Sequence, residues 1–236
     1  MPTAAALNQY KEAAAESAAA LVKEGMIVGL GSGTTATHAV HAIGRRVSQG
    51  LRITGIPTSE STAQLARSLG IPLTTLGEHP QIDMTIDGAD EVELGTLNLI
   101  KGLGGALLRE KIVASATSRF VIIVDETKLV PRLGTHDGVP VEVIPFGWQA
   151  TDARLRKLGA DTRMRTKPDG QPFLTDGGHY ILDSFFGAIA SPADLDRALN
   201  NTVGVVEHGL FIGMASEVVI GGPEGTRTLH PAGSGR

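Results

Sequence analysis

Met26-Ile-Val-Gly-Leu-Gly-Ser-Gly-Thr-Thr35 is the stretch that decides the fold class of this 236-residue chain. A short apolar run leads into a glycine-rich turn, and residues 36–47 then carry apolar side chains at helical spacing. This order predicts a buried strand, a loop and a helix. Glycines let backbone N–H groups approach an anion, and a helix N-terminus adds positive partial charge. The loop therefore predicts a phosphate site, although a tight turn capped by Thr34 or Thr35 would also explain it.

The alternation of strand and helix continues on both sides of this stretch. Helices are predicted over residues 7–23, 61–69 and 106–116, and strands over residues 52–57, 84–86 and 120–124. Such alternation predicts an α/β fold, with a Rossmann-like parallel sheet that has helices on both faces. Functional side chains of these sheets gather at the carboxyl ends of the strands.

The pattern changes after about residue 130. Strands are expected over residues 139–144, 163–166 and 180–183, and helices over residues 148–158 and from Ser191-Pro192 onward. Residues 218–220 are expected to return to the first sheet. We therefore predict a Rossmann-like catalytic domain from residues 1–131 and 209–236, and a small α+β, ferredoxin-like domain from residues 132–208.

The composition excludes several classes of function. The chain has no cysteine, which rules out disulfides, thiolate metal sites and cysteine nucleophiles. A formal net charge of −4 gives no broad attraction to nucleic acid or to anionic lipid. No window approaches the roughly 18 apolar residues that a membrane span requires. We expect a cytoplasmic protein that acts on a small molecule, with no nucleic acid and no membrane as partner.

Three carboxylates follow the predicted strand at residues 84–86, in the motif Asp87-Gly88-Ala89-Asp90-Glu91. Paired carboxylates can bind a metal or hold sugar hydroxyls. No histidine lies next to the motif, so hydroxyl binding is favoured over a metal site. An exposed acidic turn is the alternative.

Lysine and glycine come together in Lys101-Gly102-Leu103-Gly104-Gly105-Ala106, which leads into the predicted helix at residues 106–116. Glu110 lies about one turn inside this helix. A carboxylate near a helix N-terminus with cations beside it is normally ionised, and an ionised carboxylate can act as a base. The alternative is that Arg109, Glu110 and Lys111 form an ordinary solvated face.

A second lysine, Lys128, follows the predicted strand at residues 120–124 in the motif Asp125-Glu126-Thr127-Lys128. At the carboxyl end of a central strand, its side chain would point toward the expected site. A surface lysine in a loop is the alternative.

Taken in order, these motifs resemble the A-type ribose-5-phosphate isomerase family. The matching stretches are residues 29–36, 87–91, 101–111 and 125–128, with support from residues 140–145, 180–183 and 209–211. The loop departs slightly, since the family commonly has Gly-Thr-Gly-Ser-Thr where this chain has Gly31-Ser32-Gly33-Thr34-Thr35, and Leu103 replaces what is often glycine. Hydroxyls are nevertheless kept in the loop.

The resemblance implies an aldose–ketose isomerase that interconverts ribose 5-phosphate and ribulose 5-phosphate through an enediolate, without a cofactor or metal. It implies that Glu110 moves the proton between C2 and C1, that Asp87 assists ring opening, and that Lys101 stabilises the enediolate. The other implied substrate contacts are Ser32, Gly33, Thr34 and Thr35 for the phosphate, and Gly88, Ala89, Asp90, Gly102, Leu103, Gly104 and Lys128 for the rest. It also implies a homodimer or homotetramer.

Two other functions are compatible with a related fold. A non-catalytic sugar-phosphate-binding regulator would need a DNA-binding module, and the short N-terminal part has no room for one. An amino-sugar-phosphate deaminase is the second, and the pairing of residues 87–91 with residues 101–105 favours the pentose isomerase instead.

Overall fold

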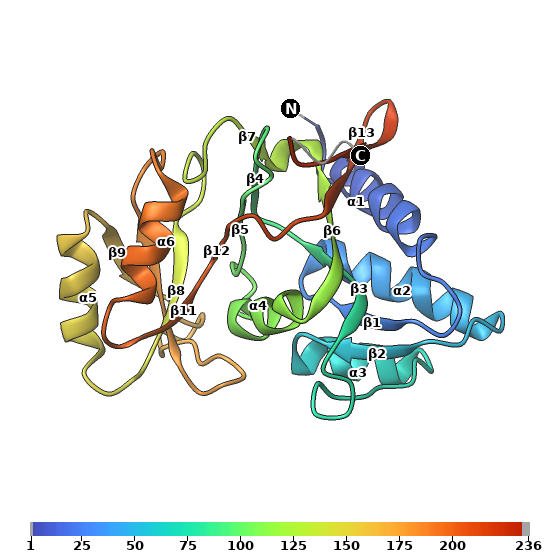
Figure 1. Cartoon of the computed structure of the whole chain (residues 1–236). Coiled ribbons are helices and arrows are strands. Elements are labelled where there is room, and N and C mark those ends of the chain that lie inside the picture. Colours follow the sequence, from blue (N-terminus) through green and yellow to red (C-terminus); the bar gives the residue numbers. More distant parts are fainter. Residues whose placement is uncertain (1, 233–236) are drawn as a thin grey trace.

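The computed structural model describes residues 2–232 and has a six-stranded sheet at the centre of its larger part (Figure 1). The strands lie in the order β14 (Gly225–Leu229), β13 (Glu217–Gly222), β6 (Thr117–Asp125), β3 (Ile82–Gly88), β1 (Ile27–Leu30) and β2 (Thr54–Pro57). Neighbouring strands are parallel except β13 and β14, which form an antiparallel hairpin at the edge. The predicted parallel sheet is confirmed, and the edge strand β14 is an addition to it.

Two helices, α1 (Ala4–Ala19) and α2 (Thr34–Ser48), cover one face of this sheet. Helix α1 approaches the sheet closely because Gly221 of β13 has no side chain: a Cβ there would lie 1.9 Å from the carbonyl oxygen of Tyr10. Helix α3 (Glu60–Ser68) lies beside the edge strand β2. This close packing brings one side of α1 to the carboxyl end of β1.

The opposite face carries α4 (Leu107–Ser115) and a small second sheet. That sheet has the order β12 (Leu210–Phe211), β5 (Leu99–Ile100), β4 (Glu91–Glu93) and β7 (Leu129–Val130). Successive side chains of β6 point to opposite faces of the sheet. Val121 and Ile123 pack toward α1 and α2, whereas Phe120 and Ile122 pack toward Phe211. The sequence analysis did not predict the second sheet, because strands of two or three residues are too short for a readable period.

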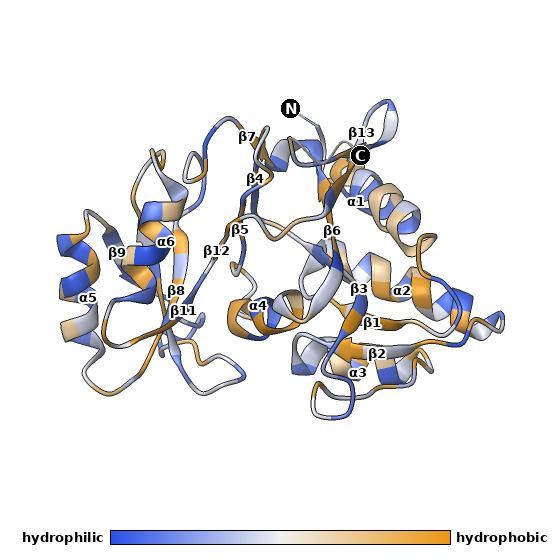
Figure 2. Cartoon of the chain, viewed as in Figure 1, coloured by the Kyte–Doolittle hydropathy of each residue, from blue (hydrophilic) through white to orange (hydrophobic). Residues whose placement is uncertain are grey.

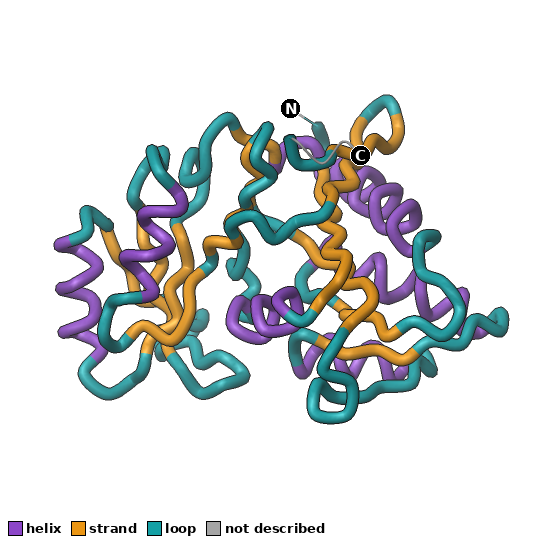
Figure 3. Tube along the Cα trace, in the orientation of Figure 1, coloured by secondary structure: helices purple, strands orange, loops and turns teal. Residues whose placement is uncertain are grey.

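A third sheet has the order β11 (Val205–His208), β8 (Val139–Val143), β10 (Tyr180–Phe185) and β9 (Asp161–Met164). It is a separate sheet, but its core includes Ile100, Val130 and Leu210 of the second sheet. It is antiparallel throughout. Helices α5 (Trp148–Lys157) and α6 (Pro192–Asn200) lie together on the side away from the large sheet (Figures 1 and 3). Along the chain the elements follow the order β-α-β-β-α-β, which is the ferredoxin-like arrangement.

The boundaries of some elements differ from the predicted ones. Helix α1 begins at Ala4, where the Thr3 hydroxyl accepts a hydrogen bond from the Ala6 N–H at 3.2 Å, and it ends before the predicted residue 23. The strand predicted over residues 163–166 is β9, whose register is set by pairing of Asp161 with Phe185. In Figure 2 the apolar residues concentrate on the strands of the large sheet, and they are also seen on β8 and α4. Among the described residues, no helix is long and apolar enough to cross a membrane.

Candidate active site

A pocket of about 120 Å³ lies at the carboxyl ends of β1, β3 and β6. It is lined by Lys11, Ser32, Gly33, Thr34, Thr35, Gly88, Ala89, Asp90, Lys101, Gly102, Gly104, Glu110 and Lys128. Tertiary structure thus brings all four predicted motifs together. Two predicted residues are not in the lining: Asp87 lies beneath it, fully buried, and the Leu103 side chain is exposed.

The loop between β1 and α2 passes very close to β3. A Cβ on Gly31 would lie 2.2 Å from Oδ1 of Asp87, and Gly33 has a φ of +92°, so glycine is required at both positions. Helix α2 begins at Thr34 with no side-chain cap. The first N–H groups of any α-helix have no intrahelical partner. Because no side chain caps α2, these groups remain available to a ligand.

Ser32 takes a different place from Thr34 and Thr35. Its hydroxyl donates to Ser59 Oγ at 2.7 Å and lies 2.8 Å from Thr58 Oγ1 and 3.1 Å from Thr62 Oγ1. Its N–H donates to Oδ1 of Asp87 at 3.1 Å. The Ser32 hydroxyl thus ties the loop to α3, and Thr34 and Thr35 line the pocket from the first turn of α2.

Lys11 is the pocket residue that the sequence analysis missed. It comes from α1, and its ammonium group lies 3.4 Å from Thr34 Oγ1. In an alanine-rich helix with other charged residues, a single lysine looks like part of a solvated face. No local signal distinguishes it, because its position follows from the packing of α1 against α2.

Three buried charged groups form the centre of the site. Lys101 Nζ lies 3.0 Å from Asp87 Oδ2 and 3.2 Å from Glu110 Oε2, and it donates to the Gly88 carbonyl at 2.6 Å. Asp87 is 0% exposed, Lys101 2% and Glu110 5%. They come from the end of β3, the residue after β5 and the first turn of α4, so one cation sits between two carboxyl groups.

Burial decides the protonation of this triad. It raises the pKa of Glu110 to about 8, an effect that Lys101 opposes and Asp87 reinforces. Burial likewise raises the pKa of Asp87. For Lys101 burial acts in the other direction, but the carboxylates of Asp87 and Glu110 outweigh it and raise the pKa. One ammonium group can balance one carboxylate, so near neutral pH the pair of carboxyl groups retains a proton.

Glu110 therefore differs from the sequence-based expectation in two respects. Its neighbours in the chain do not act on it as cations: Arg109 pairs with Glu60 at 2.8 Å, and Lys111 pairs with Glu207 at 2.6 Å. The sequence analysis expected an ionised carboxylate on a cation-rich helix end, whereas here burial outweighs Lys101 and raises the pKa of Glu110. The alternative of a solvated face is wrong, since Glu110 is buried.

The remaining carboxylates of the 87–91 motif have separate partners. Asp90 lines the pocket and accepts a hydrogen bond from the Leu103 N–H at 2.9 Å. Glu91 is fully buried and accepts from the N–H groups of Gly134, His136 and Asp137 at 2.6, 2.6 and 2.9 Å. The alternative of an exposed acidic turn is wrong. Glu91 instead holds the segment that leads from β7 to the third sheet.

Lys128 closes the pocket from the short helix η1 (Glu126–Lys128), which follows β6 directly. The Asp125 side chain caps this helix by accepting a hydrogen bond from the Thr127 N–H at 3.1 Å. The pocket thus has ammonium groups from Lys11, Lys101 and Lys128 around a volume of about 120 Å³. Residues 2–232 contain no group of three or more His, Cys, Asp or Glu side chains that could hold a metal ion.

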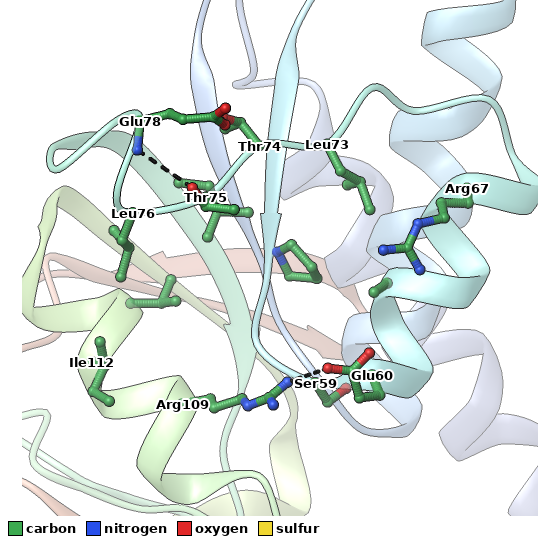
Figure 4. A pocket seen from close by; sticks show the side chains of 14 residues that line it. Ser59, Glu60, Arg67, Leu73, Thr74, Thr75, Leu76, Glu78, Arg109 and Ile112 are labelled. Atoms are coloured by element: carbon green, nitrogen blue, oxygen red, sulfur yellow. Dashed lines mark hydrogen bonds and ion pairs between the residues drawn. The ribbon is translucent and has the colours of Figure 1, made fainter. Parts of the chain in front are cut away.

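A larger cavity of about 430 Å³ lies between α3, the segment after it and α4 (Figure 4). Most of its wall is apolar, including Ile56, Leu73 and Ile112, and its charged groups include the ion pair of Arg109 with Glu60. None of the residues predicted for the site lines it. Helix α4 contributes to both spaces, with Glu110 in the pocket and Arg109 and Ile112 in the cavity.

Known proteins are similar to this chain over almost its whole length. The family model of ribose 5-phosphate isomerase A (phosphoriboisomerase A) matches residues 54–225. Proteins named ribose-5-phosphate isomerase A from Synechococcus sp. (strain JA-3-3Ab) and Gloeobacter violaceus (strain ATCC 29082 / PCC 7421) are 57% and 58% identical to it. Each alignment covers 96% of this chain, and it covers 99% and 98% of the two relatives, respectively.

Solved structures show the same similarity in three dimensions. A D-ribose-5-phosphate isomerase in complex with phospho-erythronic acid superimposes with a TM-score of 0.92 at 37% identity, covering 95% of this chain and 99% of that one. The ribose 5-phosphate isomerase A of Methanocaldococcus jannaschii has a TM-score of 0.90 at 40% identity, with 94% and 98% covered. The chain belongs to the ribose 5-phosphate isomerase A family.

Proposed function

We propose that this chain interconverts D-ribose 5-phosphate and D-ribulose 5-phosphate through an enediolate, with Glu110 as the base. The observation that carries the proposal is the buried triad of Asp87, Lys101 and Glu110 beside a phosphate-binding loop. Proton transfer at a carbon next to a carbonyl needs a base and a positive charge near the developing oxyanion. A relative solved with a phosphorylated four-carbon sugar acid supports this substrate class.

The phosphate would lie at the start of α2. There the free N–H groups of the first turn, the hydroxyls of Thr34 and Thr35 and the ammonium of Lys11 converge. A doubly charged phosphate is stabilised by amide donors and by the positive end of the helix dipole. With the phosphate held there, the sugar carbons would extend toward Lys101 and Glu110, which line the same pocket.

Glu110 would take the proton from C2 of the open-chain aldose and return it to C1. During this transfer negative charge develops on the carbonyl oxygen, and the ammonium of Lys101 stabilises it. Asp87, 3.0 Å from the same ammonium, would assist opening of the furanose ring and move protons between hydroxyl oxygens. Glu110 would act as the base once it is ionised, and Asp87, whose pKa burial also raises, would carry the proton that transfer between the hydroxyl oxygens requires.

The remaining pocket residues would hold the sugar. Asp90 accepts hydrogen bonds from sugar hydroxyls, and Lys128 binds the substrate from η1. Gly88, Ala89, Gly102 and Gly104 present backbone close to the carbon chain, where larger side chains would fill the space. Leu103 takes part through its backbone, since its N–H is bound to Asp90. Ser32 supports the loop through its contact with Ser59.

The setting of the enzyme is also proposed. We expect it to work without a cofactor in the cytoplasm, in the pentose phosphate pathway, as a homodimer or homotetramer. We further propose that residues 1–131 and 209–236 form the catalytic domain and residues 132–208 the smaller one. The isomerisation moves a proton within one molecule and needs no electron acceptor, and the family is usually dimeric or tetrameric.

An isomerase assay tests the proposal directly. Incubation with ribose 5-phosphate should produce ketose, and the rate should not change when a chelator is added. A chain that binds the sugar phosphate without producing ketose would be a regulator, and one that releases ammonia from an amino-sugar phosphate would be a deaminase. Either outcome, or inactivation by the chelator, would contradict the proposal.

A further inference from the structure

The small α+β part of the molecule reaches into the catalytic part through the hairpin between β9 and β10, at residues 165–179. Three side chains of this hairpin contact the catalytic part: Arg165, Phe173 and Asp176. Arg165 and Phe173 lie on the glycine-rich loop at residues 101–105. None of the three belongs to the pocket.

Arg165 holds two carbonyl groups of that loop. Its Nη1 donates to the carbonyl oxygens of Gly102 and Leu103, both at 2.9 Å. The guanidinium itself is fixed by Asp183 on β10, which accepts from Nε at 3.0 Å and also from Nη2. The side chains are 13% and 22% exposed, respectively. A two-point pair of this kind fixes the plane of the guanidinium, so the position of Nη1 is determined by the small domain.

These contacts determine the direction of two peptide groups. The Gly102–Leu103 peptide is held at both ends, its carbonyl by Arg165 and its N–H by Asp90 at 2.9 Å. In the next peptide the Leu103 carbonyl is bound to Arg165. Because the C=O and N–H of a trans peptide point in opposite directions, the Gly104 N–H points away from Arg165. Gly104 lines the same pocket as Lys101 and Glu110.

Phe173 and Asp176 support the same loop and its helix. A Cβ on Gly105, which has a φ of +84°, would lie 2.5 Å from the Phe173 ring, so the ring packs directly on the backbone. Asp176 accepts from the Glu60 N–H at 2.9 Å and lies 3.5 Å from Arg109. The hairpin therefore fixes the loop relative to both α3 and α4, which carries Glu110.

We propose that Arg165 is a positioning residue for the isomerisation, which holds the backbone of residues 102–104 so that the Gly104 N–H faces the reacting sugar oxygens. This inference rests on the proposed function. Arg165 does not contact the phosphate seat, formed by Thr34, Thr35 and Lys11, which supplies the charged contacts to the bound substrate. Loss of Arg165 should therefore affect the transition state more than the ground state.

The test compares Arg165→Ala with Arg163→Ala in the full-length chain. Arg163 lies on β9, two residues before Arg165; its side chain is 70% exposed, and it pairs with Asp161 rather than with the loop. We expect kcat for ribose 5-phosphate to fall about 10- to 100-fold in Arg165→Ala with little change in KM, since small misplacements of a catalytic group have effects of this size. Arg163→Ala should have the kcat and KM of the wild type.

A second measurement does not depend on turnover. Amide hydrogen exchange in the free protein should become faster at residues 102–105 in Arg165→Ala, and should not change there in Arg163→Ala. Asp183→Asn, which keeps Arg165 but loosens its guanidinium, should show a smaller effect of the same kind, and it serves if Arg165→Ala does not fold. Arg165→Lys should restore only part of kcat, because an ammonium group cannot bind Asp183 and both carbonyls in one plane.

The outcomes separate the two proposals. Absence of isomerase activity in the wild type would overturn the proposed function, and hydrogen exchange would still decide whether Arg165 holds the loop. Wild-type kcat in Arg165→Ala would overturn the positioning role. Equal losses of kcat in Arg165→Ala and Arg163→Ala, matched by equal losses of thermal stability, would overturn it as well.

Discussion

The pocket at Glu110 and the cavity on the other side of α4 differ in size and in charge, and the smaller space is the one suited to catalysis. The cavity is larger, at about 430 Å³ against about 120 Å³, and its wall is mostly apolar. Its Arg109–Glu60 pair has side chains that are 41% and 59% exposed, whereas Lys101 and Glu110 in the pocket are almost completely buried. Charges removed from water interact more strongly than solvated charges do, and burial raises the pKa of Glu110 in the pocket.

The largest effect on activity should follow from changing Glu110, the buried carboxyl group of the pocket. Glu110→Gln keeps the size of the side chain but removes the base, so kcat should fall by about 10²- to 10⁴-fold while KM changes little. Steady-state kinetics with ribose 5-phosphate measure both constants. Near-normal turnover in this variant would exclude Glu110 as the base.

Removing the buried cation should destabilise the protein. Lys101→Met leaves Asp87 and Glu110 buried without their partner, and breaking a buried pair in this way costs about 3–5 kcal/mol. Urea unfolding measures the free energy of unfolding, and part of the loss should be recovered at lower pH, where both carboxyl groups are protonated. A variant as stable as the wild type at every pH would mean that water reaches the carboxyl groups.

The pH dependence should show opposite trends for activity and stability. Glu110 must be ionised to act as a base, so kcat/KM should rise with pH until about pH 8, roughly tenfold per unit below that pKa. Its pKa is higher in the folded protein than its ordinary value of 4.5, so the folded state binds more protons. That contribution to stability is complete below pH 4.5 and is lost as the pH rises through about 8.

A pH–rate profile and urea unfolding at several pH values check both trends. A flat rate profile between about pH 6 and pH 9 would indicate that Glu110 has an ordinary pKa, by the relation between ionisation and rate. Glu110→Gln is the control for stability, since it should remove the Glu110 contribution to the pH dependence.

A substitution of Lys11 tests whether α1 contributes to phosphate binding in the pocket. Lys11→Ala removes one ammonium group near Thr34, and we expect KM for ribose 5-phosphate to rise about tenfold, which corresponds to about 1.4 kcal/mol. Because the phosphate does not react, kcat should change less than KM. Lys23→Ala, which changes a lysine outside the pocket lining, is the control. An unchanged KM would remove Lys11 from the phosphate seat.

The smallest effect is expected in the large cavity. Glu60→Gln is the same chemical change as Glu110→Gln, made in an exposed ion pair on the other side of α4. Such pairs contribute at most about 1 kcal/mol to stability, and kcat should stay at the wild-type level. Thermal unfolding and the isomerase assay measure this. A loss of activity comparable to that of Glu110→Gln would contradict the distinction between the two spaces.

Much of the site could be predicted because its residues follow strands of a parallel sheet. Thr34, Asp90 and Lys128 follow the ends of β1, β3 and β6 within a few residues, so the position of each in the chain already placed it at one edge of the sheet. Lys11 and Arg165 could not be found in this way. Lys11 reaches Thr34 across 23 positions and Arg165 reaches Gly102 across 63, and neither contact follows from local pattern.

The sequence by itself determined the alternation of strands and helices, the glycines that the close approach at Gly31 requires, and which carboxylates and lysines would meet at the sheet edge. Tertiary structure decided how those groups ionise and which way they point. Burial is a property of the assembled layers, so the raised pKa of Glu110, the engaged hydroxyl of Ser32 and the hold of Arg165 on the loop arise only when distant segments pack together.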